Sequence, residues 1–250
     1  MESLLSQPLA GRIALITGAS RGIGHATAIA LAKAGAHVVA VARTVGGLEE
    51  VDDAIKNAGG TATLVPLDLK DYEGIDRLGA SLHERYGKLD VLVANAGLLG
   101  ALSPMSHVEP KVFDDVMAVN VTANYRLIRS LDPLLQQSDA GRAVFLTSGA
   151  AWMPMAYWGT YSVSKAAVEL MARIYAAETA TTKLRVNVFN PGPIRTRMRA
   201  TAMPGEDPMT LDTPENCAAK IIDLCVPGYT ETGTLYNYRV KKFLSWTPPA

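Results

Sequence analysis

Short apolar runs rich in β-branched residues alternate with longer segments of helical periodicity along this 250-residue chain. The run at 91–94 carries no polar side chain, a pattern typical of strands that helices cover on both faces of a parallel sheet. We therefore predict an α/β fold with one doubly wound, Rossmann-like parallel β-sheet and helices on both faces. The predicted strands lie at 13–17, 38–42, 62–66, 91–94, 143–147, 185–189 and 234–238.

No linker, repeat or low-complexity tract interrupts this alternation, so we expect residues 1–250 to form one domain. The least regular stretch, residues 203–213, carries Pro204, Gly205 and Pro208 and precedes a predicted helix beginning near Pro214. Together with the residues just before it, this stretch predicts a mobile substrate lid at 198–213.

The composition favours a small-molecule partner. Hydrophobic residues make up 48% of the chain and charged residues 19%, which describes a well-buried globular core. Twenty-four basic and twenty-four acidic residues leave no net charge, so neither nucleic acid nor an anionic membrane surface is expected as partner. No stretch reaches the roughly 18 apolar residues of a membrane span, and Met1–Pro8 lacks a basic cluster followed by an apolar core. We expect a cytoplasmic protein without a metal site.

The two cysteines, Cys217 and Cys225, are expected to share one helix. Eight residues at the helical rise separate them by about 12 Å, which is beyond disulfide reach. Both are predicted to be reduced, packed thiols.

A glycine-rich turn follows the first predicted strand. Gly18, Gly22 and Gly24 open a helix, and glycine lets backbone amides approach a pyrophosphate at the helix N-terminus. The spacing Gly-x-x-x-Gly-x-Gly differs from the general dinucleotide fingerprint, so the motif alone does not establish the cofactor. Its alternative is an ordinary strand-to-helix turn.

The end of the second strand bears on which dinucleotide binds. An NAD site usually carries an acidic residue there, but this chain has Arg43. Arg43 and Arg21 offer planar donors suited to a ribose 2′-phosphate, which favours NADP(H). Alternatively, both arginines are solvated surface residues.

Tyr161 and Lys165 lie four residues apart in a segment with the composition of a helix, so their side chains share one face. A tyrosine hydroxyl is a poor acid or base near neutral pH, but a neighbouring ammonium and an oxidised nicotinamide both favour the phenolate and lower the pKa. Ser148, at the end of the fifth strand, can donate a hydrogen bond to a substrate oxygen that gains charge. Taken singly, each residue also has an ordinary structural explanation.

In this order, the motifs resemble those of the short-chain dehydrogenase/reductase family, specifically its single-domain branch of about 250 residues. The resemblance runs from about Gly11 to Tyr238. It rests on four features: Thr-Gly-x-x-x-Gly-x-Gly at 17–24, Asn-Ala-Gly at 95–97, Ser148, and the pair Tyr161 and Lys165. It implies an NADP(H)-dependent oxidoreductase that transfers a hydride between the nicotinamide and a carbonyl or alcohol, with Tyr161 as general acid/base.

The resemblance also implies roles for individual residues. Asn120 would hold a water of the proton relay, Ser148 would orient the substrate, and Lys165 would bind the nicotinamide ribose and lower the pKa of Tyr161. The implied cofactor-binding residues are Gly18, Ser20, Arg21, Gly22, Ile23, Gly24, Arg43, Asp68, Leu69, Asn95, Ala96, Gly97, Tyr161, Lys165, Pro191, Gly192, Ile194 and Thr196.

Three of these assignments have structural alternatives. Asp68 can cap the following helix, Asn95 can bridge neighbouring strands, and Asn120 can be a buried, satisfied amide. The chain also departs from the family pattern at Thr147, where a second serine is frequent, and at 241–250, which lacks the Gly-Gly close of acyl-carrier reductases. The latter departure disfavours a role in fatty-acid synthesis.

The residues expected to face the substrate are mostly apolar, aromatic or thioether side chains, which favours an apolar or ring-containing carbonyl compound. They are Leu98, Leu99, Ala150, Trp152, Met153, Met155, Tyr157, Trp158, Pro193, Met198 and Met203. An acidic substrate recognised by Arg195, Arg197 and Arg199 ranks second, because an arginine run beside a lid is more often solvated.

The segment 161–179 carries small or apolar residues around most of its circumference, which predicts a homodimer or homotetramer packed through one face of this helix. A partly exposed alanine-rich face without a partner is the alternative. A rival to the enzyme is an NADP(H)-binding regulatory sensor without turnover, against which the Asn120, Ser148, Tyr161 and Lys165 set argues. A sugar-nucleotide epimerase is disfavoured because only about sixty residues follow Pro191.

Overall fold

A computed structural model describes residues 7–244, and these contain one eight-stranded sheet. Strands from both ends of the described chain belong to it. The strands are β1 (Ile13–Thr17), β2 (His37–Ala42), β3 (Thr61–Pro66), β4 (Val91–Ala94), β5 (Arg142–Leu146), β6 (Arg185–Asn190), β7 (Leu235–Asn237) and β8 (Lys242–Leu244).

The strand order is β3-β2-β1-β4-β5-β6-β7-β8, and every pair from β3 to β7 is parallel. Each predicted strand is present, with ends displaced by three residues or fewer. The sequence did not predict β8, which pairs antiparallel with β7. All three residues of β8 are exposed, so this edge strand lacks the buried apolar run that revealed the others.

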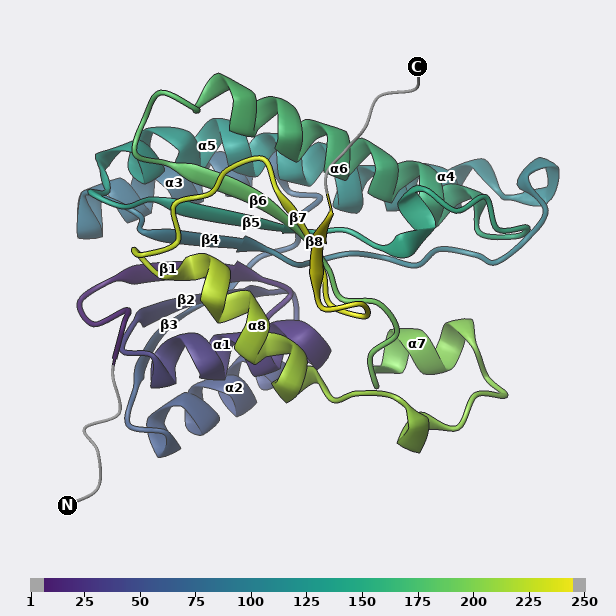
Figure 1. Ribbon diagram of the computed structural model, residues 1–250, viewed down its shortest axis with the longest axis horizontal. Helices are drawn as coiled ribbons and strands as arrows, with labels where there is room; N and C mark the ends of the chain where they lie inside the picture. The colour runs from purple at the N-terminus through teal and green to yellow at the C-terminus, as the bar shows by residue number, and fades with distance from the viewer. Residues whose placement is uncertain (1–6, 245–250) are drawn as a thin grey trace.

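Helices cover both faces of the sheet (Figure 1), which confirms the predicted doubly wound α/β fold. On one face lie α1, α2 and α8, and on the other α3, α5 and α6, each layer burying its own apolar cluster against the strands. The helices of eight or more residues are α1 (Gly22–Lys33), α2 (Val45–Asn57), α3 (Tyr72–Tyr86), α4 (Pro110–Met117), α5 (Ala123–Gln137), α6 (Gly159–Glu178) and α8 (Pro214–Cys225).

Shorter helical segments lie in the connections at the carboxyl ends of the strands. They are the 3-10 turns η1 (Met105–His107), η3 (Gly149–Ala151) and η4 (Pro208–Thr210), the π-helical η2 (Ala118–Thr122), and the α-helix α7 (Arg197–Ala202). In Figure 1, α7 and the segment that follows it extend beyond the layers of the main body. This segment covers most of the predicted lid.

The strand order reverses between β1 and β4, because the chain moves outward from β1 to β3 and then returns to the other side of β1. Ligands of open α/β sheets bind at the carboxyl ends of the strands beside such a reversal. The glycine turn after β1 and the Asn-Ala-Gly segment after β4 both lie there. The fold thus places the two predicted cofactor motifs side by side.

Cys217 and Cys225 both lie in α8, and both are free and buried, as predicted. Burial raises the pKa of each thiol to about 12. Within residues 7–244 no helix is long and apolar enough to cross a membrane. Residues 1–6 and 245–250 lie outside the described structure, and with them most of Met1–Pro8 and the second half of 241–250, on which two of the sequence expectations rest.

Candidate active site

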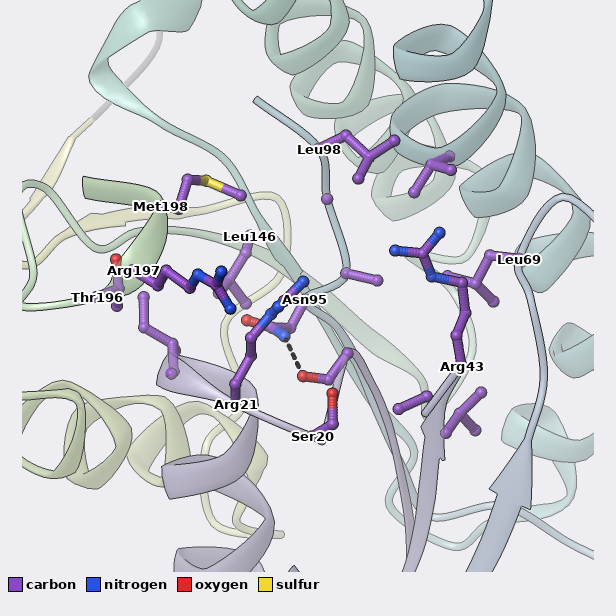
Figure 2. Close-up of a pocket in the computed structure, with 18 of the residues that line it drawn as sticks. Ser20, Arg21, Arg43, Leu69, Asn95, Leu98, Leu146, Thr196, Arg197 and Met198 are labelled. Atoms are coloured by element: carbon purple, nitrogen blue, oxygen red, sulfur yellow. Dashed lines mark hydrogen bonds between the residues drawn. The ribbon is translucent and has the colours of Figure 1, made fainter. Parts of the chain in front are cut away.

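One cavity of about 250 Å³ opens at the carboxyl ends of the strands. Its walls come from the glycine turn, from the segments after β2 to β6, and from α6 and α7 (Figure 2). Of the predicted site residues, those that line it are Gly18, Ser20, Arg21, Gly22, Ile23, Arg43, Asp68, Leu69, Asn95, Ala96, Gly97, Tyr161, Lys165, Pro191 and Thr196. Gly24, Asn120, Ser148, Gly192 and Ile194 lie outside its lining.

Three glycines of this turn occupy positions where a side chain is disfavoured or does not fit. Gly18 and Gly22 have φ angles of +70° and +58°, in the left-handed region that side chains disfavour. At Gly24, a Cβ atom would overlap the carbonyl oxygen of Gly18 and come within 2.5 Å of Asn95 Nδ2. Arg21, the residue before α1, has no side-chain cap on the first turn of that helix. The first amides of α1 therefore stay open toward the cavity.

Asn95 supports this turn from the neighbouring strand. Its Nδ2 donates to the carbonyl oxygen of Thr17 at 2.8 Å, and its backbone N–H donates to Thr17 Oγ1 at 3.1 Å. The bridging alternative considered for Asn95 is therefore present, and the residue also lines the cavity. It ties the end of β4 to the start of the glycine turn.

Three arginines, Arg21, Arg43 and Arg197, line the cavity. In Figure 2, Arg43 lies beside Leu69 at one side, while the side chains of Arg21 and Arg197 both extend into the space at the other side. Arg43 Nη1 is 4.0 Å from Asp68 Oδ2, and both side chains are about half exposed, so this contact is weak. Positive charge thus surrounds a cavity that the glycine turn already opens to an anion.

Asp68 does not cap the helix that follows it. Asp71 does, because its carboxyl group accepts from Gly74 N at 2.8 Å at the start of α3. Asp68 Oδ1 instead accepts from Lys70 N at 3.0 Å within the turn after β3. Its position on the cavity wall is compatible with the cofactor contact that the family resemblance implied.

Tyr161 and Lys165 lie one turn apart on α6 and are buried, with 9% and 5% of each residue exposed. Lys165 Nζ lies 5.8 Å from the centre of the Tyr161 ring and donates to the carbonyl oxygen of Leu146 at 2.8 Å. Ser148, two residues beyond the end of β5, shares a side-chain hydrogen bond with Tyr161 and caps η3 by accepting from Ala150 N at 3.2 Å. The fold brings the three residues together.

Burial shifts the pKa values of both Tyr161 and Lys165. It raises the pKa of Tyr161 to about 12, while the hydrogen bond from Ser148 acts in the opposite direction. The same burial lowers the pKa of Lys165 to about 8. The sequence predicted that Lys165 lowers the pKa of Tyr161. In the protein alone the desolvation of the phenolate is the larger effect, and the phenol stays protonated at neutral pH.

Asn120 lies in the π-helical segment η2 and is fully buried. Its Oδ1 accepts from Leu98 N at 2.7 Å, and its Nδ2 donates to Leu98 O and to Ser164 Oγ, both at 2.9 Å. Asn124 Nδ2 donates to its backbone carbonyl oxygen at 2.6 Å. These bonds match the satisfied-amide alternative, and they fix the chain at Leu98 on the cavity wall.

The segment after β6 reaches the cavity through Pro191 and Thr196. Gly192 has a φ of +65°, and its N–H donates to Asn190 Oδ1 at 3.0 Å, which closes a tight turn. Ile194 is buried in the core beneath this turn. Gly192 and Ile194 therefore shape the segment without lining the cavity.

Comparison with known proteins decides the family. A model for short chain dehydrogenases matches residues 12–207. The chain belongs to the short-chain dehydrogenase family. It is 42% identical over 206 residues to the uncharacterized oxidoreductase YciK of Escherichia coli K12, covering 81% of each chain.

Solved structures agree with this membership. A short chain dehydrogenase of Shigella flexneri 2a, complexed with NADP, has a TM-score of 0.90 at 39% identity, covering 94% of this chain and 99% of that one. One from Escherichia coli CFT073, complexed with NADPH, has a TM-score of 0.87 at 39% identity, covering 93% and 99%. The resemblance seen in the motifs of this short-chain dehydrogenase is thereby confirmed.

The arginine run after β6 divides into distinct contacts in this short-chain dehydrogenase. Arg195 donates to the carbonyl oxygens of Pro208 and Leu211 at 2.9 and 3.2 Å, and Arg199 forms a two-bond ion pair with Glu206 at 2.6 and 2.7 Å. Arg195, just before the predicted lid, bonds the end of the lid, and Arg199 forms its ion pair within the lid. Arg197 alone of the three lines the cavity. The sequence did not assign it to the cofactor, although its place directly after Thr196 is a signal that could have done so.

Of the residues expected to face the substrate, Leu98 and Met198 line the cavity. Others stay exposed around it on the segment between β5 and α6 and on the lid, namely Trp152, Met153, Tyr157 and Met203. Trp158 packs edge-on against Tyr161, with ring centres 6.1 Å apart. An aromatic side chain from the predicted substrate-facing set thus packs directly against Tyr161.

Proposed function

We propose that this short-chain dehydrogenase is an NADP(H)-dependent reductase of an apolar or ring-containing carbonyl compound. One observation carries the proposal: Tyr161, which lies one turn from Lys165 and whose phenol interacts with the Ser148 hydroxyl, lines the same cavity as a glycine turn and three arginines. A proton donor and a site suited to a dinucleotide thus share one space. The Shigella flexneri and Escherichia coli relatives solved with NADP or NADPH support this cofactor.

The residues present fit the cofactor. Gly18 and Gly22 on the cavity wall, together with the open amides of α1, suit a pyrophosphate. Arg43 and Arg21 suit a 2′-phosphate, because guanidinium groups match phosphate oxygens and no carboxylate ends β2. Asp68 and Leu69 would contact the adenine, and Lys165 would meet the nicotinamide ribose. When bound, the cofactor would supply the hydride and, once oxidised, a positive charge that favours the phenolate.

Tyr161 is suited to the reduction direction. Its raised pKa keeps the phenol protonated, which is the form that can give a proton to a carbonyl oxygen as that oxygen gains negative charge. Ser148 can donate a hydrogen bond to the same oxygen. Lys165 lies close enough to stabilise the phenolate left behind. Asn120 would act at a distance, because its side-chain amide bonds Leu98 and Ser164.

The test replaces one hydroxyl. Tyr161→Phe should lower turnover of NADPH with a panel of ketones, aldehydes and quinones by about a hundredfold or more, because general-acid catalysis contributes that much. The Kd for NADPH should stay within about twofold, since the hydroxyl makes no contact that holds the phosphates. Tyr125→Phe, which removes an exposed hydroxyl on α5, is the matched control and should retain full activity.

Each other result has a defined meaning. Equal activity of Tyr161→Phe and the wild type would refute the proton donor. Tight NADPH binding without turnover of any substrate by the wild type would instead favour a regulatory sensor. Absence of NADPH binding would refute the cofactor assignment itself.

We also propose that residues 198–213 form a lid over the bound substrate. The segment carries exposed thioether side chains at Met198, Met203 and Met209, and the first of these lines the cavity. Such side chains adapt to apolar ligands of differing shape. The ion pair of Arg199 with Glu206 keeps the segment compact, so it can close as a unit.

A further inference from the structure

Glu169 is a buried acidic residue that the proposed reaction does not use. It lies on α6, one turn beyond Lys165, and only 7% of the residue is exposed. Its Oε2 accepts two hydrogen bonds, from Thr147 Oγ1 at 3.1 Å and from Trp152 Nε1 at 2.7 Å. A buried carboxyl group costs desolvation free energy, and these two donors offset part of that cost.

The two donors lie on either side of Ser148. Thr147 directly precedes it, and Trp152 directly follows η3, the turn that Ser148 caps. Thr147 is also fixed to the sheet, because its N–H donates to Phe189 O at 2.9 Å, and its Oγ1 lies 3.5 Å from Lys165 O. One carboxyl oxygen therefore joins both ends of the segment 147–152 to the helix that carries Tyr161 and Lys165.

We infer that Glu169 is a positioning residue that holds Ser148 in register with Tyr161. Apart from this oxygen, the segment after Ser148 is closed by bonds within its own turn, such as Trp152 N to Gly149 O at 3.3 Å and Ala151 N to Ser148 O at 3.0 Å. The indole N–H on Oε2 is shorter than both. Glu169 thus fixes the distance between the segment 147–152 and α6, which the bonds within the turn do not set.

The position of Ser148 matters for the chemistry of Tyr161. Besides desolvation, the groups that act on the phenol are the hydroxyl of Ser148, from the loop, and the ammonium of Lys165, from α6. If the loop moves away from α6, the phenol loses its hydrogen bond to Ser148, which favours the phenolate. Displacement of Ser148 should therefore raise the pKa of Tyr161 and weaken the contact to the substrate oxygen.

The inference rests on the proposed reductase, and the experiment separates the two. The full-length protein is assayed with NADPH and a carbonyl substrate that the wild type reduces, across a pH series. The variants are Glu169→Leu, which removes both acceptors, Glu169→Gln, which keeps one oxygen able to accept both bonds, and Trp152→Phe and Thr147→Val, which each remove one donor. Glu178→Leu, the same change at an exposed position of α6, is the control.

For Glu169→Leu we expect kcat to fall about tenfold to a hundredfold, in the range of losing one well-placed donor, with the Kd for NADPH unchanged. The basic limb of its pH profile should move to higher pH. Glu169→Gln should recover most of the activity, and Trp152→Phe and Thr147→Val should each lose part of it. These two variants test the inference even if Glu169→Leu does not fold.

Two results would overturn the inference. One is that Glu169→Leu, or both Trp152→Phe and Thr147→Val, keep the kcat and the pH profile of the wild type. The other is a lower melting temperature in these variants with no change in kcat or pH profile, which would make Glu169 purely structural. A wild type without turnover would refute the reductase instead. In that case ultraviolet titration of Tyr161, taken as the difference from Tyr161→Phe, decides whether Glu169→Leu raises its pKa.

Discussion

Tyr161 and Lys165 share one buried environment, and burial shifts their pKa values in opposite directions. It favours the neutral phenol, which raises the pKa of Tyr161 to about 12, and the neutral amine, which lowers the pKa of Lys165 to about 8. A phenolate formed during reduction therefore has beside it a lysine that releases its proton more readily than a solvated one. The pair is suited to returning the tyrosine to its protonated form.

The lowered pKa of Lys165 makes a prediction about stability. In the unfolded chain the pKa is near 10.5 and in the folded protein about 8, so between these values the unfolded chain binds more protons. Folding stability contributed by Lys165 must then rise as pH rises from 8 to 10.5. Relative to Lys165→Met, the free energy of unfolding of the wild type should increase by up to about 3 kcal/mol across this range.

Denaturant unfolding of both proteins at pH 7, 8, 9 and 10 measures this difference. The other titrating groups, including both buried thiols, are common to the two proteins and cancel. Loss of the Lys165 side chain, with its hydrogen bond to Leu146 O, adds an offset between the two curves, and the prediction concerns how their difference changes with pH. Parallel curves for the two proteins would mean that Lys165 keeps an ordinary pKa when folded.

Arg43 permits a prediction about the choice of cofactor. Arg43→Asp replaces a cation at the end of β2 with a carboxylate beside Asp68, so a 2′-phosphate would meet two negative charges. We expect the ratio of kcat/KM for NADPH to that for NADH to fall at least about tenfold, since hydrogen bonds to charged groups contribute about 1.5–3 kcal/mol. Arg43→Gln separates loss of the cation from gain of the anion and should shift the ratio less. An unchanged ratio in both variants would make Arg43 a surface residue.

At the scale of elements, the segment from Thr196 to Asp212 acts as a loop with its own internal bonds. Ile194 pairs with Asp212 at its base, Arg195 binds carbonyl oxygens near its far end, and Arg199 pairs with Glu206 within it. Arg197 extends instead into the cavity, which Arg21 also lines (Figure 2). A cofactor phosphate bound in this cavity would attract both guanidinium groups, and through Arg197 it would draw the lid toward the glycine turn.

Because Arg197 lines the cavity and Arg199 does not, their variants should affect cofactor binding differently. Arg197→Gln should raise the Kd for NADPH about tenfold and that for NADH by the same factor, because the pyrophosphate is common to both. Arg199→Gln breaks the ion pair in the same segment but should leave both values within about twofold. Fluorescence titration measures the four constants. Equal effects of the two variants would mean that lid folding, and not a phosphate contact, explains the loss.

How much of the structure could be predicted from the sequence differs from element to element. The elements β1, β4 and α6 were predictable, because the buried strands are continuous apolar runs and the helix carries apolar residues at helical spacing. The exposed strand β8 has no such pattern. Contacts between distant segments were also invisible, including the bonds from Asn95 to Thr17 and from Trp152 to Glu169. The arginine run shows this limit most clearly, since three neighbouring cations have three different surroundings that only the fold determines.

For the whole molecule, α6 has two unlike faces. Its inner face carries Tyr161, Lys165 and Val168 against the sheet. Its outer face exposes Val163, Leu170 and Ile174, each more than two-fifths accessible. Because these three recur at helical spacing, they form one apolar stripe along α6. Tyr125, on α5, is also exposed, and the bond from Tyr175 to Asp132 ties α6 to α5.

We propose that this stripe packs against the same stripe of a second copy, as a two-fold axis requires. A stable dimer buries about 800 Å² on each partner, so its centre must lose all water. Leu170→Glu with Ile174→Glu would place four carboxylates at that centre, two from each copy. By light scattering coupled to size exclusion, we expect the wild type to have at least twice the mass of one chain and the double variant the mass of one. Val45→Glu, a change at an equally exposed apolar residue of α2, should keep the larger mass. A wild type with the mass of one chain would mean that the stripe faces solvent.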